Sequence, residues 1–240
     1  MSVLKKKIGL VVEENYVYAR ALHYLGIDFF LDEHRSLQEV CDQKGISRQQ
    51  VVKCFYEFDN ASKSSFTELQ QYPMELLLEY LRHSHHLFIK QKLPYISYLL
   101  KNHGSPELED LKGVFPEFVE DFIKHIYEEE DQLFDYVFTL NKVASGKVNN
   151  PAKLLVKDNA ISLVDLQHDH DNEDEMANMR ELIEGFQALD LHSRVILNEI
   201  KAFDREILYH ATIEDDILFP RAIQLEKEVF QKISDLSKLN

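Results

Sequence analysis

The amino-acid sequence predicts an all-α protein, in which an antiparallel four-helix bundle follows a small helical N-terminal domain. Three observations carry this prediction. The 240 residues include only seven glycines and six prolines, a composition that favours long helices over a turn-rich β fold. Apolar residues recur at helical spacing over four long stretches, and no stretch alternates apolar and polar residues as a half-buried strand does.

The small N-terminal domain is expected over residues 1–58. Its segments VYARALHYLGIDFF and SLQEVCDQKGI carry apolar residues at helical spacing. Ser36 and Ser47 are the expected N-caps, because a serine side chain can accept a hydrogen bond from the first turn of a helix. Gly26 and Gly45 are the expected helix ends.

The remainder of the chain is predicted to be a linker followed by the bundle. Residues 59–68 are polar and rich in serine, which is typical of a linker, and the bundle is expected over residues 69–240. Long amphipathic helices with short connections pack antiparallel. Pro116 and Pro220 are expected sites of interruption or kinking. The four predicted helices are Met74–Leu100, Leu108–Val143, Ser162–Leu189 and His192–Leu225.

Charge and composition exclude several classes of partner. The formal net charge of −15 would repel a phosphate backbone, so no nucleic-acid partner is expected. No apolar run approaches about 18 residues, so no membrane partner is expected either. The lysines near the N-terminus precede only five apolar residues, too few for a signal peptide. Cys41 and Cys54 form no CxxC pair, and a reducing, cytoplasmic location is predicted.

One unusual pattern occurs twice, in HIYEEEDQLFDYV at residues 125–137 and in HATIEDDILFPRA at residues 210–222. Each copy places a glutamate four residues after a histidine, so both side chains leave the same helix face. One metal ion can then take an imidazole from one turn and a carboxylate from the next. The matching residues are His125 and His210, Glu129 and Glu214, Asp131 and Asp216, Leu133 and Leu218, and Phe134 and Phe219.

The other two predicted helices also carry histidines, in RHSHHLFIKQKLP and LQHDHDNEDEM. Imidazoles combined with carboxylates inside a four-helix bundle are typical of di-iron and di-manganese centres. Zinc sites more often use cysteine, and neither cysteine lies in this region. The residues alone therefore predict a helical bundle that holds two metal ions.

With these motifs, the sequence resembles the hemerythrin-like di-iron family for repair of iron centres, which restores iron–sulfur clusters after nitrosative or oxidative damage. The resemblance covers nearly the whole chain through HHLFIKQKLP, HIYEEEDQLF, HDHDNEDEM, HATIEDDILFPRA and the N-terminal LGIDFFLDEHRSLQEVCDQKGI. The family normally has Cys-Cys-Gly-Gly after Gly-Ile-Asp-Phe, but residues 30–33 here are Phe-Leu-Asp-Glu. Cys41 remains. The N-terminal domain is thus degenerate, and it is expected to serve docking or dimerisation.

The resemblance implies two non-haem iron ions per chain, bridged by carboxylates. On the first helix it selects His86, which stands seven residues before Leu93, over His83; His85 is expected to be exposed. On the third helix it selects His170, whereas His168 is expected to be solvated. The implied metal ligands are His86, His125, Glu129, His170, His210 and Glu214.

Several neighbouring residues are assigned supporting roles or none. His103 lies 17 residues after His86, or about 25 Å along a continuous helix, so it is expected to cap a helix or support the site. Asp121 and Asp169 are either hydrogen-bond partners of the ligand histidines or solvated. Glu130 is expected to leave a different helix face from the ligands.

The leading functional hypothesis, which comes from the resemblance, is a cytoplasmic protein that donates iron to damaged iron–sulfur proteins. One alternative is a di-iron enzyme that reduces NO or peroxide. Another is a sensor or store for O₂, NO or iron. An enzyme would turn over NO with an electron donor, whereas an iron donor would lose iron stoichiometrically to an apo-protein. A sensor would instead change its shape or its partner. O₂ or NO is the expected small ligand, and a homodimer through the N-terminal domain is compatible with each hypothesis.

Overall fold

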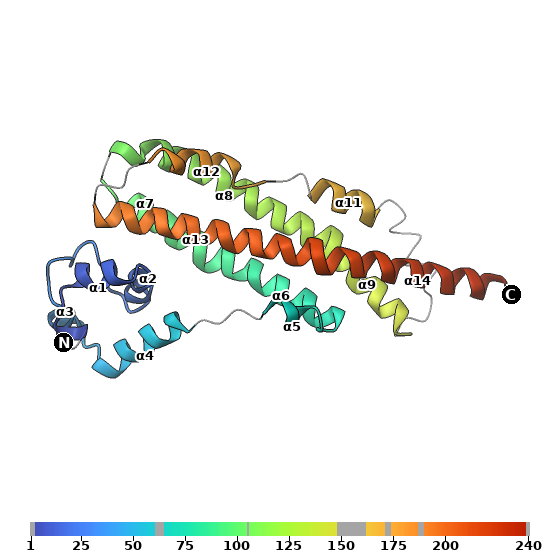
Figure 1. Ribbon diagram of the computed structural model, residues 1–240, viewed down its shortest axis with the longest axis horizontal. Helices are drawn as coiled ribbons and strands as arrows, with labels where there is room; N and C mark the ends of the chain where they lie inside the picture. Colours follow the sequence, from blue (N-terminus) through green and yellow to red (C-terminus); the bar gives the residue numbers. More distant parts are fainter. Residues whose placement is uncertain are drawn as a thin grey trace. The chain divides into compact units, whose positions relative to one another are not determined.

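The computed structural model describes residues 3–60, 65–104, 106–147, 162–170, 174–186 and 190–238. These residues are almost entirely helical, and among them no strand forms beyond an isolated bridge between Lys7 and Ser36 (Figure 1). The prediction of an all-α protein is therefore confirmed for this part of the chain. No described helix combines the length and the apolar character needed to cross a lipid bilayer.

The chain divides into two compact units, and each combines segments that are distant in the sequence. Unit 1 comprises Met1–Lys63, Tyr95–Leu108 and Ile183–Ala202. Unit 2 comprises Ser64–Pro94, Glu109–Leu182 and Phe203–Asn240. The predicted domain boundaries at residues 58 and 69 remain predictions, and residues 61–64 of the expected linker lie outside the described residues.

Unit 1 contains the short helices of the N-terminal region. Their ranges are α1, Ile8–Glu14; α2, Val17–Tyr24; α3, Leu37–Lys44; and α4, Arg48–Asp59. Unit 1 also contains most of α7, Leu93–Lys101, and the first half of α13, Leu191–Ile213. Fully buried aliphatic side chains fill its interior, among them Ile8, Val11, Leu22, Ile27, Leu37, Val40, Val51, Val195 and Ile200.

The helix ends in unit 1 are those that the sequence predicts. Ser36 caps α3 and Ser47 caps α4, and each has the two reciprocal hydrogen bonds of a capping box. Gly45 ends α3 at φ 69°, and Gly26 follows α2 at φ 74°. Because glycine has no Cβ, it adopts this left-handed conformation without a steric penalty.

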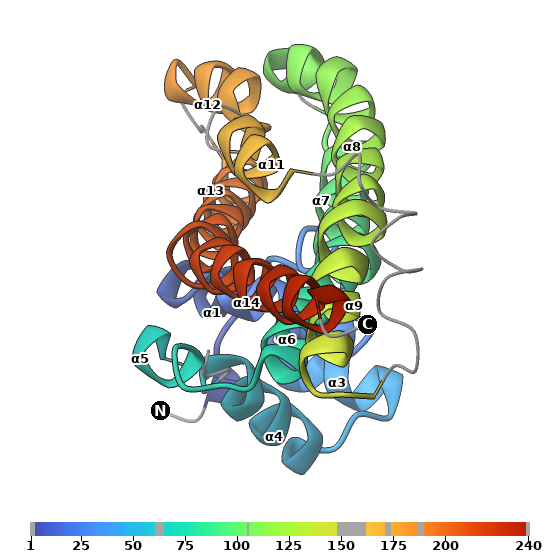
Figure 2. The same cartoon turned by 90° about the vertical axis from the view of Figure 1, so that its right-hand side faces the viewer.

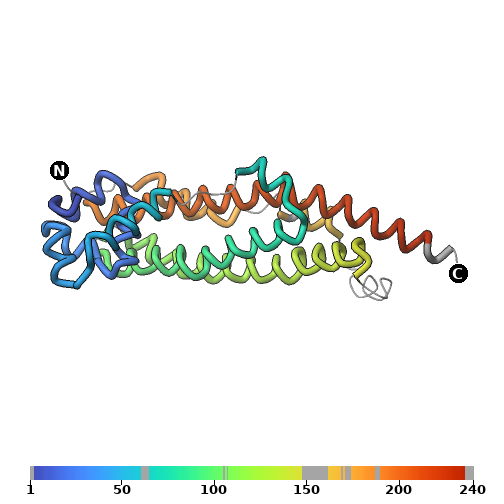
Figure 3. The backbone as a smooth tube through the Cα atoms, turned by 90° about the horizontal axis from the view of Figure 1, so that it is seen from below, coloured from blue at the N-terminus to red at the C-terminus, as the bar shows by residue number. Residues whose placement is uncertain are grey.

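Unit 2 is built from four helical runs, which follow alternating directions along the chain (Figure 3). The first run contains α6, Met74–Leu87, preceded by the short α5, Phe66–Leu69. The second contains α8, Glu109–Glu129, and α9, Asp135–Ala144. The third contains α11, Leu163–His170, and α12, Ala177–Glu184. The fourth contains the second half of α13 and α14, Phe219–Lys238.

One apolar core holds unit 2 together. In it, α9 packs against α6 and α14, while α11 packs against α14 (Figure 2). Each fully buried Leu or Phe contributes about 2 kcal/mol by leaving water. The buried members include Leu69, Leu77, Leu78, Leu81, Phe134, Val137, Leu140, Leu163, Ile213, Leu218, Phe219, Ala222 and Val229.

Three π-helical turns interrupt the long runs, at Phe88–Lys92, Glu130–Phe134 and Glu214–Leu218. A π turn closes its hydrogen bonds from i to i+5 and so holds one residue more than an α-turn. Each such turn shifts the helix face that later residues occupy.

Two further expectations about the helices need correction. The predicted helix Ser162–Leu189 is divided, because α11 ends at His170 and α12 begins at Ala177. Pro116 lies inside α8, which runs unbroken, so the expected interruption there is wrong. Pro220 is the second residue after the third π turn, so its missing N–H falls where the helical hydrogen-bond pattern already changes.

Candidate metal centre

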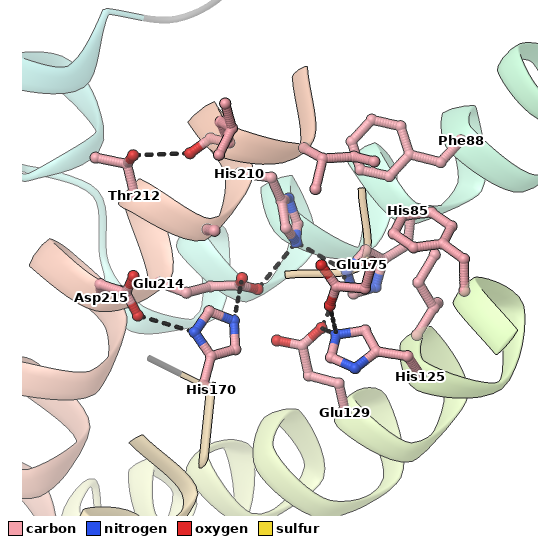
Figure 4. A pocket seen from close by; sticks show the side chains of 15 residues that line it. His85, Phe88, His125, Glu129, His170, Glu175, His210, Thr212, Glu214 and Asp215 are labelled. Carbon is pink, nitrogen blue, oxygen red and sulfur yellow. Dashed lines mark hydrogen bonds and ion pairs between the residues drawn. The ribbon is translucent and has the colours of Figure 1, made fainter. Parts of the chain in front are cut away.

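Four side chains of unit 2 converge in its interior. One ligand atom from each of His85, Glu129, His210 and Glu214 lies within 4.8 Å of all the others. The Nε2 atoms of His85 and His210 are 2.8 Å apart (Figure 4). Imidazole nitrogens and carboxylate oxygens at this spacing can hold a metal ion.

Glu214 faces histidines from two different helical runs. Its Oε1 lies 2.9 Å from Nε2 of His210, and its Oε2 lies 3.2 Å from Nε2 of His170. Glu129 extends in the same way from the second run: its Oε2 is 3.3 Å from Nε2 of His85 and 4.0 Å from Nε2 of His125. Carboxylates that reach two imidazoles can bridge two metal ions.

Some buried donor atoms of this cluster have no hydrogen bond within the described residues. They are Oε1 of Glu129, Oε1 of Glu214 and Nδ1 of His210. Although Glu214 Oε1 is close to His210 Nε2, the contact lacks hydrogen-bond geometry. Leaving a buried polar atom unpaired costs about 1–3 kcal/mol, and more for a charged group. A cation bound by the carboxylate oxygens would remove that cost, so the donor set fits a divalent transition metal.

The pKa values of the two glutamates are shifted in opposite directions. Burial and the charge of Glu214 raise the pKa of Glu129 to about 8. Burial also opposes charge on Glu214, but His210 and His170 outweigh it and hold its pKa well below the usual range. Two buried carboxylates that share a site cannot both ionise without a positive charge nearby. A bound metal ion would supply that charge and displace the proton.

The histidines are affected by the same carboxylates. Burial opposes charge on His85, but hydrogen bonds to Glu129 and Glu130 raise its pKa to about 9. Burial likewise opposes charge on His170, and Glu214 raises its pKa to about 10. Without metal, protons therefore balance the carboxylate charge. Metal binding must release these protons, because a coordinated imidazole is neutral.

The site is built from two equivalent halves that lie 85 residues apart in the sequence. The same offset separates the two copies of the motif in the second and fourth helical runs. It also relates residues outside that motif, in the first and third runs. The pairs are His85 and His170, His125 and His210, Glu129 and Glu214, Glu130 and Asp215, and Phe134 and Phe219.

The contacts of the two halves repeat as well. His85 places Nδ1 2.8 Å from Oε1 of Glu130 and stacks on Phe134, with 5.3 Å between ring centroids. His170 places Nδ1 2.9 Å from Oδ1 of Asp215, and its ring centroid lies 5.5 Å from that of Phe219. In each half, one acid faces Nε2 of the histidine and the next residue holds Nδ1. Such a hydrogen bond fixes the orientation of an imidazole that binds metal.

The structure brings five of the six expected ligands to one cavity of about 240 Å³. They are His125, Glu129, His170, His210 and Glu214. The sixth, His86, is exposed, and His85 lies in the cluster with an exposed fraction of 2%. The expectation that His85 is exposed is therefore wrong, whereas the assignment of His86 as a ligand stays a prediction, which its exposed position does not favour. His83 and His168 are exposed.

The π turn Phe88–Lys92 explains the exchange of His86 for His85. Seven residues make two α-turns, so His86 and Leu93 would share a face on a regular helix. The π turn adds one residue between them, and the histidine eight residues before Leu93 takes the buried position instead. A signal for this was present in the sequence, because His85, and not His86, stands 85 residues before His170.

The supporting residues also differ from those expected. Glu130 was expected to leave another helix face, but it contacts His85. Asp121 is exposed, and the side chain of Asp169 lies outside the described residues. His103 belongs to unit 1, where its Nε2 lies 3.3 Å from Asp190. Asp190 in turn accepts a hydrogen bond from the backbone N–H of Ser193 at the start of α13, so His103 supports a helix cap.

No protein-family model, curated protein or solved structure matches this chain.

Proposed function

We propose that the chain is a non-haem di-iron protein with a hemerythrin-like four-helix bundle, which donates iron to repair iron–sulfur clusters damaged by nitrosative or oxidative stress. The observation that carries the proposal is the position of Glu214, whose two oxygens face His210 and His170 separately. Because Glu129 occupies the equivalent position of the other half, two bridging carboxylates lie between two pairs of histidines.

The repeat assigns the ligands to two metal positions. His85 and His210, whose Nε2 atoms are 2.8 Å apart, would hold one iron. Their counterparts His170 and His125 would hold the other, with Glu129 and Glu214 between the two positions. With two histidines and two shared carboxylates, each iron would retain room for a small ligand such as O₂ or NO. Nitrogen and oxygen ligands also release iron more readily than thiolates do, because thiolates are the soft ligands that hold iron in iron–sulfur clusters.

When bound, the iron pair supplies ligand exchange and redox chemistry, and each iron ion is also the cargo that the protein would deliver. The chain orients the histidines through Glu130 and Asp215. Aromatic rings of Phe88, Phe134 and Phe219 pack against the imidazoles of the cluster. These rings limit the access of water, which strengthens the attraction between the carboxylates and a cation.

Thiol chemistry has no place in this proposal. Cys41 is 3% exposed and Cys54 is 4% exposed, and burial raises the pKa of both thiols. A thiol with a raised pKa is mostly protonated at neutral pH, and the thiolate is the form that binds metal or attacks. The N-terminal region is therefore assigned to docking with damaged iron–sulfur proteins or to dimerisation, within a cytoplasmic protein.

The test is iron loading under anaerobic conditions, followed by metal analysis and Mössbauer spectroscopy. The proposal expects about two coupled irons per chain, and stoichiometric transfer of iron to an apo iron–sulfur protein. Retention of no iron, or of a single zinc ion, would contradict it.

A second candidate function is reduction of NO or peroxide at the same centre. The cavity of about 240 Å³ beside the cluster favours it, because apolar side chains of Phe88, Phe122, Ile126 and Ile207 line it together with the ligands. A space of this size and polarity admits a small molecule next to the metal. Repeated turnover of NO or peroxide with an electron donor, without loss of iron, would support this enzyme over an iron donor.

A further inference from the structure

The two halves of the site differ in how their second histidine is held. His210 places Nε2 2.8 Å from that of His85, and the repeat predicts the same relation between His125 and His170. Instead, His125 lies nearer to a residue outside the four-residue cluster. Its Nε2 is 3.2 Å from Oε1 of Glu175, but 4.0 Å from Oε2 of Glu129 (Figure 4).

His125 is also the most exposed of the four histidines. Its side chain is 25% exposed, compared with 13% for His170, 9% for His210 and 2% for His85. The metal position that His125 shares with His170 is therefore nearer to solvent than the position that His85 shares with His210.

A row of three acids and one histidine leads from solvent to this position. Glu117, Asp121, His125 and Glu129 follow one another at intervals of four residues on α8. Each residue in the row shares a helix face with the next, about 40° around the helix and about 6 Å along its axis. The first two are exposed and the last two are partly buried. At the inner end, Oε1 of Glu129 is buried and has no hydrogen-bond partner within the described residues.

Two cavities meet along this row of residues. An outer cavity of about 440 Å³ is lined by Glu117, Asp121, His125 and Glu175. His125 and Glu175 also line the inner cavity that contains the cluster. Asp174 lines the outer cavity too, but its carboxylate is paired with Arg180 at 2.7 Å. The His125–Glu175 pair thus stands between the outer cavity and the cluster.

The equivalent positions in the other half carry or contact positive charge. The counterpart of Asp121, 85 residues later, is Glu206, and Nζ of Lys92 lies 2.7 Å from its carboxylate. The counterpart of Glu175, 85 residues earlier, is Lys90. Within the described residues, no lysine or arginine pairs with Asp121. A divalent cation therefore meets carboxylates in one half and lysines in the other.

We propose that the metal ion held by His125 and His170 is the exchangeable one, and that it enters and leaves as a divalent cation along the Glu117–Asp121 face of α8. On release, the bond from His125 Nε2 to the metal breaks, and His125 turns to Glu175. Carboxylate oxygens and water take over the ion, with no change in its oxidation state. This inference rests on the proposed function, because it assigns the iron to be donated.

The test uses protein loaded anaerobically with Fe²⁺ and mixed in a stopped-flow instrument with an excess of a coloured Fe²⁺ chelator. We expect two phases, with one iron per chain released fast and one slowly. The double variant Glu117→Gln with Asp121→Asn should slow the fast phase and the loading of that iron about ten-fold each, because the charges that concentrate the cation are removed. Its affinity for iron should stay unchanged, because both rates fall together.

The matched control is Glu120→Gln, which removes an exposed charge from α8 next to Asp121 but on another face. It should leave both phases unchanged. Glu175→Gln should slow the fast phase about ten-fold and leave the slow phase intact, because His125 loses its alternative partner.

Three outcomes would overturn the inference without touching the proposed function: release of both irons at one rate, a fast phase insensitive to the double variant and to Glu175→Gln, or an effect of Glu120→Gln equal to that of the double variant. A fall in affinity in the Glu117→Gln, Asp121→Asn variant would also overturn it, because these residues would then be ligands. Failure of the unaltered protein to retain two irons would contradict the proposed function instead.

Discussion

Two groups of buried or half-buried histidines in this protein have opposite surroundings. In unit 2, His85 has a carboxylate at each ring nitrogen, Glu129 at Nε2 and Glu130 at Nδ1. In unit 1, His192 stacks on Phe30, with ring centroids 4.4 Å apart and planes 6° apart, and its buried Nε2 has no hydrogen-bond partner within the described residues.

The surroundings determine which form of each histidine is favoured. The carboxylates raise the pKa of His85 to about 9, whereas burial and the neighbouring His103 lower that of His192 to about 4. A histidine in the interior is therefore a candidate ligand when acids flank both nitrogens, whether or not an aromatic ring also packs on it, and a packing residue when aromatic rings flank it and no acid contacts its nitrogens. The sequence contains eleven histidines, and it does not separate these two kinds. The residues that surround each histidine in the fold do.

The largest effect should come from removing a bridge. Glu214→Ala deletes the carboxylate that faces both His210 and His170, so we expect loss of the paired centre and of both irons. In unit 1, where His192 packs against Phe30, His192→Gln should leave about two irons per chain. Metal analysis after anaerobic loading decides the matter, and an equal loss in both variants would break the distinction between the two groups.

The next effect separates two adjacent histidines on α6. His85→Ala should weaken iron binding about 100-fold or more, because it removes an imidazole from the buried cluster. His86→Ala should change it less than about two-fold, because His86 is exposed. Competition with a chelator of known affinity measures both values. A larger loss for His86→Ala would restore the ligand assignment made from the sequence.

Much of the fold could be predicted because its signals are local. Apolar residues at helical spacing predict the long helices, and Ser36, Ser47 and Gly45 mark helix ends through their own backbone chemistry. The π turns have no such local signal. Each depends on how the whole run packs, and the turn at Phe88–Lys92 alone moves the buried histidine from position 86 to position 85.

The site was predictable where the sequence repeats itself within one helix. His125 with Glu129, and His210 with Glu214, are separated by four residues and needed no knowledge of packing. Contacts between helices were not predictable in this way. That Glu130 holds His85, and that Glu175 pairs with His125, depends on the arrangement of separate helical runs.

A smaller effect is expected from the acids that orient the histidines. Glu130→Gln and Asp215→Asn should each lower iron affinity about 10- to 100-fold, the usual effect of removing the carboxylate behind a metal-bound histidine. Asp131→Asn and Asp216→Asn are matched controls, because each directly follows one of these acids in the sequence but is exposed. If the control variants lose as much affinity, general negative charge would explain the effect, and orientation of His85 and His170 would not.

The smallest effect concerns His192 and the pH dependence of the free energy of unfolding. The pKa of His192 is lowered from 6.5 to about 4 in the folded chain, where His103 lowers it further and Asp190 opposes the shift. Between these values the unfolded chain binds a proton that the folded chain does not, so stability falls as pH decreases from about 6.5 towards 4. Because the ring is only partly buried, we discount the effect for solvent screening to about 1 kcal/mol between pH 7 and pH 5. His192→Phe keeps the stack on Phe30 but removes the proton site. Denaturant unfolding of the two proteins at both pH values should therefore show a smaller acid-induced loss in the variant, whereas equal losses would show that His192 is not the residue that titrates.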